Sequence, residues 1–389
     1  MICIYNAKVY TMAGPVIENG YVTIEDGKIL DVGEMSTFNC ENTCTCVKID
    51  AKGQLLLPGF VEAHCHLGMM ESGIGFEGND VNEMTNPVTA QVRAVDGMNP
   101  MDVTVKEALE AGVTSAATGP GSGNVIGGTF MVIKTHGKRV DDMVYRDPVA
   151  MKCAFGENPK RVYNAKKRMP TTRMGTAAIM REALAKTKQY LEKIEAAGDD
   201  YSKYPAYDAN CEALLPVIKR EIPLKVHAHR ADDMFTAIRI ANEFNVRYTL
   251  DHATEGHLIA EELAEENVVC IVGPSFGHRS KFELQEKTFN TPGILAKAGI
   301  KVAITTDSPV VPLDSLPMMA SLANEAGMDE MEALKAITIN AAEILGVDDV
   351  VGSIEKGKDA DLVIYSGHPF DITSKAQKVF VNGEEVFTR

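Results

Sequence analysis

One stretch of the chain, Leu56-Leu57-Pro58-Gly59-Phe60-Val61-Glu62-Ala63-His64-Cys65-His66, is largely apolar and ends in two histidines separated by a single residue. Alternate side chains of a β-strand point to opposite faces, so His64 and His66 should point the same way. Neutral imidazole is a common metal ligand, and two imidazoles side by side make half of a divalent-metal site. The stretch therefore predicts a strand that carries metal-binding side chains at its end.

Further apolar runs end in polar side chains that can bind a metal, and these are His227, His229, His252 and Asp307. A single histidine of this kind is more often a buried hydrogen-bonding residue than a ligand. Several strand ends that agree are much harder to obtain by chance. A carboxylate beside a metal can also take a proton from water and later deliver it to a leaving nitrogen, which is the role expected of Asp307.

Strands and helices alternate between residues 58 and 345, which favours a parallel sheet. We expect strands at 57–63, 113–118, 130–134, 149–155, 223–228, 246–251, 267–272 and 300–305. Predicted helices between them include 100–111, 176–196, 231–245, 256–266 and 291–298. Eight such units indicate a TIM-like (β/α)8 barrel, an α/β fold in which active sites lie at the C-terminal ends of the strands. The Gly-rich segment 119–170 blurs the third and fourth units.

The two ends of the chain are β-rich. Short strands are predicted within residues 1–57, and the C-terminal segment contains Asn382-Gly383 between apolar strands, a typical hairpin signal. We expect residues 1–57 and 346–389 to form one small composite β-sandwich domain, and residues 58–345 to form the barrel. The long loop 67–99 after the first barrel strand is a candidate lid, substrate wall or oligomer contact.

Composition excludes several classes of function. A net charge of −15 argues against nucleic-acid binding, and no apolar run reaches the length of about 20 residues that spans a membrane. The first residues lack the order of a signal peptide, and eight scattered cysteines do not resemble a disulfide framework, so we expect a cytoplasmic protein. The closely spaced Cys40, Cys44 and Cys46 match no common zinc pattern and are interpreted as thiols of the small β domain. The expected partner is a small-molecule substrate, and a homo-oligomer is left open.

Five motifs occur in order along nearly the whole chain: Pro58-Gly59-Phe60-Val61-Glu62-Ala63-His64-Cys65-His66, Val226-His227-Ala228-His229, Leu250-Asp251-His252, Thr305-Thr306-Asp307 and Gly357-Lys358-Asp359-Ala360-Asp361-Leu362-Val363. With them the chain resembles the amidohydrolase superfamily, in its imidazolonepropionase-like branch of metal-dependent hydrolases. The resemblance implies a barrel with a composite β-sandwich. It also implies a set of metal ligands, namely His64, His66, His227, His252 and Asp307.

The resemblance leaves the ligand on the fourth strand open. Two-metal members of the superfamily use a carboxylated lysine or a glutamate there to bridge the ions. The segment 150–158 offers Lys152 and Glu157, and Glu157 is favoured because it lies nearer the expected strand end. If neither residue bridges, the site would hold one metal, as in deaminase-like members.

The remaining polar residues are candidates for contacts with the substrate. The pattern makes His227 the ligand and leaves His229 as a catalytic or substrate contact, although the two could exchange roles. His278, Arg279 and Arg230 are the other candidates, since Arg279 could hold a carboxylate with two hydrogen bonds.

The expected activity is hydrolysis of a carbon–nitrogen bond in a linear or cyclic amide, with one or two divalent ions. Zinc is the first choice, and iron or manganese would also suit these ligands. The alternatives are a one-metal deaminase of a ring amidine, a metal-dependent dipeptidase or deacetylase, and a barrel that has lost catalysis.

Overall fold

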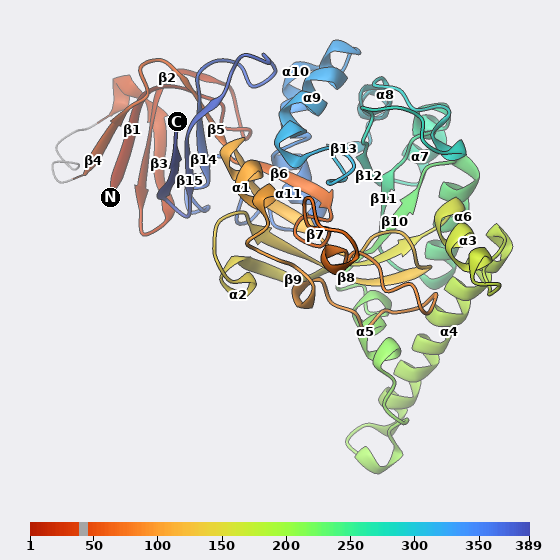
Figure 1. The fold of residues 1–389 in the computed structure, drawn as a ribbon. Helices are drawn as coiled ribbons and strands as arrows, with labels where there is room; N and C mark the ends of the chain where they lie inside the picture. The colour runs from red at the N-terminus through yellow and green to blue at the C-terminus, as the bar shows by residue number, and fades with distance from the viewer. Residues whose placement is uncertain (39–45) are drawn as a thin grey trace.

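The computed structural model describes residues 1–38 and 46–389, which form a barrel-like sheet surrounded by helices and a second sheet beside it (Figure 1). Cys40 and Cys44 lie outside the described residues. Within the described ranges, no helix is long and apolar enough to cross a membrane.

The larger sheet follows the order β13-β12-β11-β10-β9-β8-β7-β6. Its strands are β6 (Phe60–Cys65), β7 (Val113–Thr118), β8 (Ile126–Lys134), β9 (Val144–Ala154), β10 (Leu224–Ala228), β11 (Tyr248–His252), β12 (Val269–Val272) and β13 (Lys301–Ile304). The two edge strands of this sheet are β13 and β6. The Thr305 hydroxyl, directly after β13, donates to the His64 carbonyl of β6 at 2.5 Å and so connects the two edges. The predicted α/β barrel is thus confirmed as a nearly closed eight-stranded barrel.

One strand departs from the expected direction. β8 pairs antiparallel with both β7 and β9, whereas the other neighbouring strands of this sheet are parallel. A parallel neighbour requires a long crossover, usually through a helix, and the Gly-rich segment 119–125 is too short to provide one. The chain therefore turns back on itself between β7 and β8, and this is where the sequence blurred the strand–helix units.

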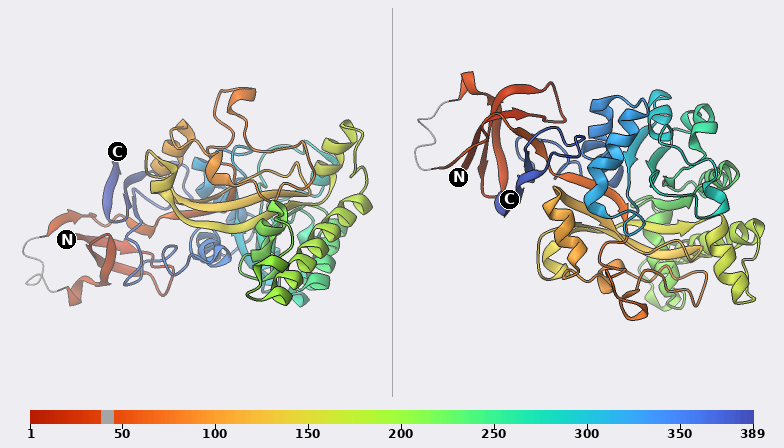
Figure 2. Two further views of the ribbon diagram at one scale, coloured as in Figure 1. Left: turned by 90° about the horizontal axis from the view of Figure 1, so that it is seen from below. Right: turned by 45° about the horizontal axis from the view of Figure 1, so that its top comes forward.

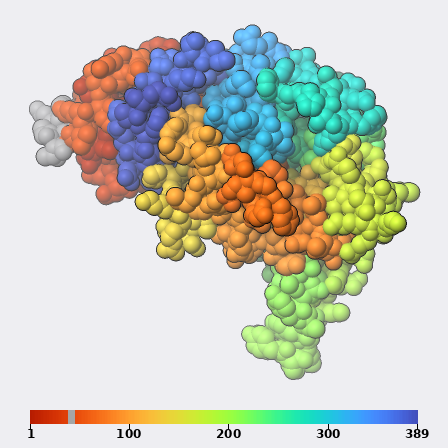
Figure 3. All heavy atoms as spheres, viewed as in Figure 1, coloured from red at the N-terminus to blue at the C-terminus, as the bar shows by residue number. Residues whose placement is uncertain are grey.

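Helices of the barrel cover its outside and connect the parallel strands (Figure 1). They are α1 (Val103–Glu110), α2 (Val140–Met143), α3 (Glu157–Ala165), α4 (Arg173–Ala197), α5 (Ala209–Ile218), α6 (Ala231–Phe244), α7 (Ala260–Glu265), α8 (Thr291–Lys297), α9 (Leu316–Glu325), α10 (Glu330–Lys335) and α11 (Ile339–Leu345). Asp102, Thr172 and Asp208 cap α1, α4 and α5 by accepting backbone N–H groups of the first turn. The tip of the α4–α5 pair projects from the body of the molecule (Figure 3).

The second sheet is built from both ends of the chain, as predicted. Its order is β16-β15-β14-β5-β1-β2-β3, with β4 paired to β1. The strands are β1 (Ile2–Val9), β2 (Ile17–Glu25), β3 (Lys28–Glu34), β4 (Val47–Asp50), β5 (Leu55–Pro58), β14 (Leu362–Tyr365), β15 (Ala376–Val381) and β16 (Glu384–Thr388). All eight strands belong to one connected sheet, which lies at the side of the barrel in each view (Figure 2).

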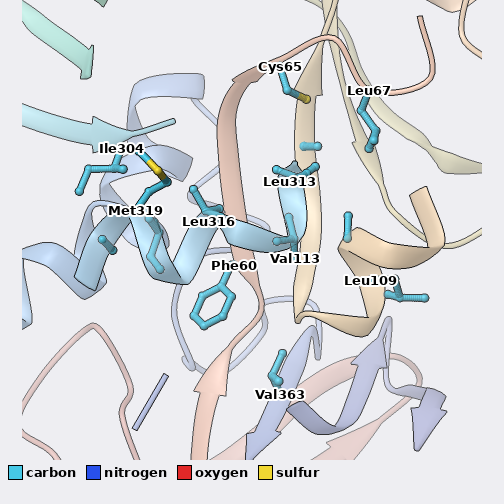
Figure 4. Packing of buried hydrophobic residues seen from close by; sticks show 14 of the residues in the cluster. Phe60, Cys65, Leu67, Leu109, Val113, Ile304, Leu313, Leu316, Met319 and Val363 are labelled. Atoms are coloured by element: carbon cyan, nitrogen blue, oxygen red, sulfur yellow. The ribbon is translucent and has the colours of Figure 1, made fainter. Parts of the chain in front are cut away.

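A shared apolar core joins the two sheets. Phe60 of β6, Leu109 of α1 and Val363 of β14 lie in one buried cluster between them (Figure 4). The chain passes from β5 to β6 through Gly59, where a Cβ atom would lie 2.0 Å from the Thr114 hydroxyl oxygen, so only glycine fits this crossing. Close packing at the junction holds the first barrel strand, and with it His64 and His66, in a fixed position.

The loop 67–99 runs back along the barrel after β6. It contains two short 3-10 turns, η3 (Phe76–Gly78) and η4 (Ala94–Asp96), and it forms isolated bridges to β8 at Val88 and Arg93. Three of its side chains, Met70, Val81 and Asn82, line a cavity at this end of the barrel. In the single chain the loop is therefore a wall of that cavity.

Candidate metal centre

The first group of metal-capable side chains comes from the two edge strands of the barrel. His64 and His66 lie at the end of β6, and Asp307 follows β13. Asp307 Oδ1 is 3.4 Å from His64 Nε2 and 3.2 Å from His66 Nε2. One donor atom from each residue can therefore surround a single ion.

The second group lies at the ends of the next parallel strands. His227 lies in β10, His229 directly follows that strand, and His252 is the last residue of β11. The three imidazoles offer nitrogens within 4.8 Å of one another. Asp307 connects the two groups, because its Oδ2 is 4.0 Å from His252 Nδ1.

Partners on the far side of the rings fix the orientation of these histidines. His66 Nδ1 lies 2.7 Å from the Gly119 carbonyl, and His252 Nδ1 lies 2.7 Å from the Gly273 carbonyl. His229 Nδ1 is 2.7 Å from the Thr254 hydroxyl. Such contacts are typical of metal-binding histidines, since they hold the ring and leave Nε2 free to face the ion.

A buried charge cluster lies directly behind the first group. Asp251 Oδ2 is 2.8 Å from His64 Nδ1, and Asp251 also pairs with Lys225 (3.4 Å) and Lys152 (3.8 Å). Lys152 Nζ is 3.3 Å from His64 Nε2. Burial lowers the pKa of Lys152 to about 8, although Asp251 opposes this shift. The amine of Lys152 is thus partly neutral near physiological pH and lies among the proposed ligands.

Burial also sets the protonation of the site itself. It lowers the pKa of His252 to about 3 and those of His227 and His229 well below 6.5, so these imidazoles are neutral and can act as ligands. Burial would raise the pKa of Asp307, but His252 and the two neighbouring histidines hold it well below its usual range. Asp307 is accordingly ionised at neutral pH and can accept a proton.

The backbone is strained at two of these residues. His252 has φ 75° and Asp307 has φ 51°, both in the left-handed region that residues with a Cβ rarely adopt. Such conformations cost roughly 1–3 kcal/mol and persist only where the surrounding structure imposes them, often at functional sites. Both residues leave their strands here, and the left-handed turn directs each side chain toward the barrel end.

Several buried side-chain atoms of the site that could coordinate a metal have no hydrogen-bond partner among the described residues. They include His252 Nε2 and Asp307 Oδ1. Buried polar atoms are nearly always satisfied, so each exception requires an explanation. Imidazole nitrogens and a carboxylate oxygen that converge without partners are the donor set that a divalent ion requires, and the residues present therefore fit such an ion.

The site opens into a cavity of about 550 Å³. His66, His227, His229 and Asp307 form its floor, while the loop 67–99 and the segment after β12 form walls. A cavity of this size accommodates a small organic molecule. Its cationic side chains are Arg161, His278 (when protonated), Lys281 and Lys287.

Not all predicted residues lie at this site. Glu157 is the first residue of α3, and its carboxylate accepts the Glu283 N–H at 3.4 Å instead of facing either histidine group. The strand before it ends at Ala154, and the buried Lys152 of that strand lies 3.3 Å from His64 Nε2. This placement differs from the expectation that favoured Glu157 as the bridge.

Of the residues predicted to contact the substrate, some line the cavity and others do not. His278 lines the cavity, whereas Arg230 and Arg279 do not. Arg230 pairs with Asp232 at 2.9 Å, and Arg279 donates to the backbone carbonyls of Gln285 and Lys287. Both arginines are therefore engaged in local contacts that stabilise their own loops.

Comparison with known proteins places this geometry in a family. The model described as "Amidohydrolase family" matches residues 55–386, which includes both histidine groups and Asp307. The chain belongs to the amidohydrolase family. A solved amidohydrolase from Thermotoga maritima MSB8 has 42% sequence identity and a TM-score of 0.96, with full coverage of both chains.

Curated relatives are more distant. An imidazolonepropionase from Geobacillus sp. (strain WCH70) is 28% identical over 95% of this chain and 87% of its own length. The amidohydrolase tasK of Hapsidospora irregularis is 27% identical over 96% of this chain, but the match spans only 39% of that protein. These similarities support the amidohydrolase barrel and its enzymatic nature without identifying a substrate.

Sequence reasoning missed one buried acid of this amidohydrolase. Glu283, in the 3-10 turn η7 (Phe282–Leu284), is 1% exposed, and its Oε1 lies 3.7 Å from His227 Nε2 and 3.6 Å from His229 Nε2. Lys281 pairs with the same oxygen at 2.7 Å. Glu283 belongs to a polar loop with no strand or helix periodicity, so the only available signal was an acid between two apolar residues.

Proposed function

We propose that this amidohydrolase cleaves a carbon–nitrogen bond of a small linear or cyclic amide and requires divalent metal, with zinc as the expected ion. The observation that carries the proposal is that two groups of metal-capable side chains gather at one end of the barrel, where His66, His227, His229 and Asp307 line one cavity. His64, His66, His227, His252 and Asp307 would hold the metal. A divalent ion there lowers the pKa of water to about 7 and polarises a carbonyl oxygen.

Asp307 is the residue that moves the proton in this proposal. It is ionised, it lines the cavity, and it lies between the two histidine groups. Its carboxylate can accept the proton of the attacking water and then donate it to the nitrogen that leaves. His229 also lines the cavity and is a candidate either for contact with the reacting group or for a place among the ligands, in exchange with His227.

The position of Lys152 favours a site for two ions. Its amine is completely buried beside His64 and within reach of Asp251, where a carboxylated lysine could bridge the two histidine groups. Lys152→Met should therefore lower metal stoichiometry from two ions toward one, while Glu157→Gln should leave it unchanged. The opposite result would return the bridge to Glu157, and unchanged stoichiometry in both would reject a bridge from this strand.

The cavity favours a substrate that carries negative charge. Arg161, Lys281 and Lys287 lie in its lining, and the carboxylates of the cavity are restricted to Asp307. Amides with a carboxylate at one end would be attracted electrostatically to this rim. Neutral analogues of the same amides should consequently show a higher KM.

A screen of metal-loaded enzyme tests the proposal. Candidate linear amides, cyclic amides, N-acyl amino acids, dipeptides and ring amidines are incubated with the zinc, manganese and iron forms, and products are separated by mass. Hydrolysis of an amide that disappears with Asp307→Asn supports the proposal. Release of ammonia from ring amidines alone would instead identify a deaminase, and turnover that is independent of added metal and unaffected by chelators would reject metal-dependent hydrolysis.

A further inference from the structure

The strongest unexplained feature beside the site is a buried carboxylate that faces the second histidine group. Glu283 Oε1 lies 3.7 Å from His227 Nε2 and 3.6 Å from His229 Nε2. Ligands about 2.0–2.2 Å from a tetrahedral zinc ion are roughly 3.4 Å from one another. The first group shows similar spacings, 3.4 Å and 3.2 Å from Asp307 Oδ1 to its two histidines. Glu283 therefore stands at ligand spacing from two imidazoles.

The carboxylate is held in this position through its other oxygen. Glu283 Oε2 accepts the backbone N–H of Glu157, the first residue of α3, at 3.1 Å. Gly156 precedes that helix with φ 83°, and a Cβ there would lie 2.6 Å from Glu283 Oε2. The helix start, the glycine and the carboxylate thus fit together so that Oε1 remains directed at the histidines.

The free oxygen has no conventional hydrogen-bond partner. Oε1 accepts no hydrogen bond of good geometry from the described residues, although the Lys281 ammonium is 2.7 Å away. Lys281 is also 3.4 Å from Asn158 Oδ1, and the Asn158 amide nitrogen is 3.3 Å from His227 Nε2. A buried anion requires a cation, and here the ammonium reaches into the space between Glu283 and the cavity.

We propose that Glu283 is an additional protein ligand of the second ion site, beside His227 and His229. This inference deepens the proposed function and depends on it. Lys281 Nζ is 2.7 Å from Glu283 Oε1 and lines the adjoining cavity, so its ammonium would compete with a divalent ion for this oxygen. A carboxylate ligand also explains why His229 is turned toward the same point as His227, since a site formed by His227 and His252 alone would not need it.

Metal titration of four proteins tests this inference. Wild type, Glu283→Gln, Lys281→Met and Glu255→Gln are stripped with chelator and titrated with zinc against a chromophoric competitor, and melting temperature is followed in parallel. Glu255→Gln is the matched control, because Glu255 likewise accepts a helix-start N–H, that of Ala231 at 2.8 Å, on the loop after β11. Circular dichroism establishes that each variant is folded.

Glu283→Gln should weaken one of two bound ions at least ~10-fold and reduce the rise in melting temperature with zinc. Lys281→Met should strengthen the same ion about fivefold, since a competing positive charge is removed. Wild-type affinity for both ions in Glu283→Gln would overturn the inference. If that variant does not fold, Lys281→Met decides alone, and unchanged zinc affinity in it would likewise overturn the inference.

The same titration separates this inference from the function on which it rests. Wild type that binds no zinc, manganese or iron would refute the proposed function itself. Wild type that binds metal, with Glu283→Gln and Lys281→Met equal to it, would refute only the role of Glu283.

Discussion

Three properties of Asp307 bear on its role. It is ionised, it contacts both histidines of β6, and its backbone is in the left-handed region. Replacement by asparagine preserves the size and much of the hydrogen bonding but removes the basic carboxylate. We expect Asp307→Asn to fold normally, to retain most of its metal and to lose at least ~100-fold in turnover on any amide substrate. Steady-state kinetics with metal analysis of the same sample measures this. Near-normal turnover with intact metal would make Asp307 structural.

At the residue scale, the histidines were predictable because a strand alternates. His64 and His66 at i, i+2 after an apolar run must share a face whatever the surrounding fold, and the same holds for His227 and His229. Lys152 and Glu157 were harder to distinguish, since the choice depends on where β9 ends. Glu283 could not be predicted, because its loop reaches the histidines only through tertiary packing.

At the scale of single elements, the first turn of α6 carries a buried acid whose ionisation opposes folding. Asp233 of α6 is buried, which raises its pKa to about 6, although Arg173, 3.0 Å away, opposes this shift. In the unfolded chain an aspartate titrates near ~3.9. Between about pH 4 and pH 6 the folded state binds more protons at this residue, so its contribution to the free energy of unfolding falls as pH rises.

Asp233→Asn removes this titration. The free energy of unfolding of the variant minus that of the wild type should therefore increase from about pH 4 to about pH 6 and then level off. Urea unfolding of the two metal-free proteins at several pH values gives the difference directly. A difference that does not change over this range would show that Asp233 keeps an ordinary pKa.

Most elements were predictable from periodicity, and the alternation of strands and helices also predicted the parallel direction of the barrel strands other than β8. The segment 113–118 was predicted as a strand with the observed bounds of β7, and 231–245 matches α6 within one residue. β8 was predicted in place but runs antiparallel, because strand patterning reports which residues are apolar and is silent on chain direction. Helix α5 was not among the helices named from the sequence, and it contains a proline at 216 that interrupts the helical signal.

At the scale of the whole molecule, a buried ion cluster links the barrel to the terminal sheet. Lys134 at the end of β8 pairs with Asp359 at 2.9 Å and Asp361 at 2.6 Å, and both acids lie in the motif 357–363 just before β14. Lys134 and Asp361 side chains are 6% and 3% exposed. Lys134→Met would leave Asp361 buried without its cation, a change that typically costs about 3–5 kcal/mol.

We expect Lys134→Met to lower the free energy of unfolding by this amount with little effect on metal affinity, since the cluster is remote from the ligands along β8. Lys106→Met is the control, because its pair with Glu110 lies on an exposed helix surface and should contribute less than ~1 kcal/mol. Denaturant unfolding with metal titration measures both quantities. Equal stability of the two variants would show that the cluster does not hold the sheet to the barrel.

The composite arrangement itself was predictable because both ends of the chain are β-rich, and the structure joins them in one sheet through β5 and β14. The contacts at the junction of the two sheets were not predictable from the sequence. There Gly59 passes close to Thr114, and Phe60 lies in one buried cluster with Val363, so the contacts join segments far apart in the chain.

The central claim is that the end of the barrel binds divalent metal through two histidine groups that share Asp307. The most direct measurement is the metal content of zinc-loaded, desalted protein, determined by elemental analysis for wild type, the double variant His64→Ala/His66→Ala and the single variant His252→Ala. The account predicts bound zinc in the wild type, loss of at least one ion per chain in each variant, and folded protein in all three. Wild type without zinc, or variants that keep the wild-type amount, would contradict it.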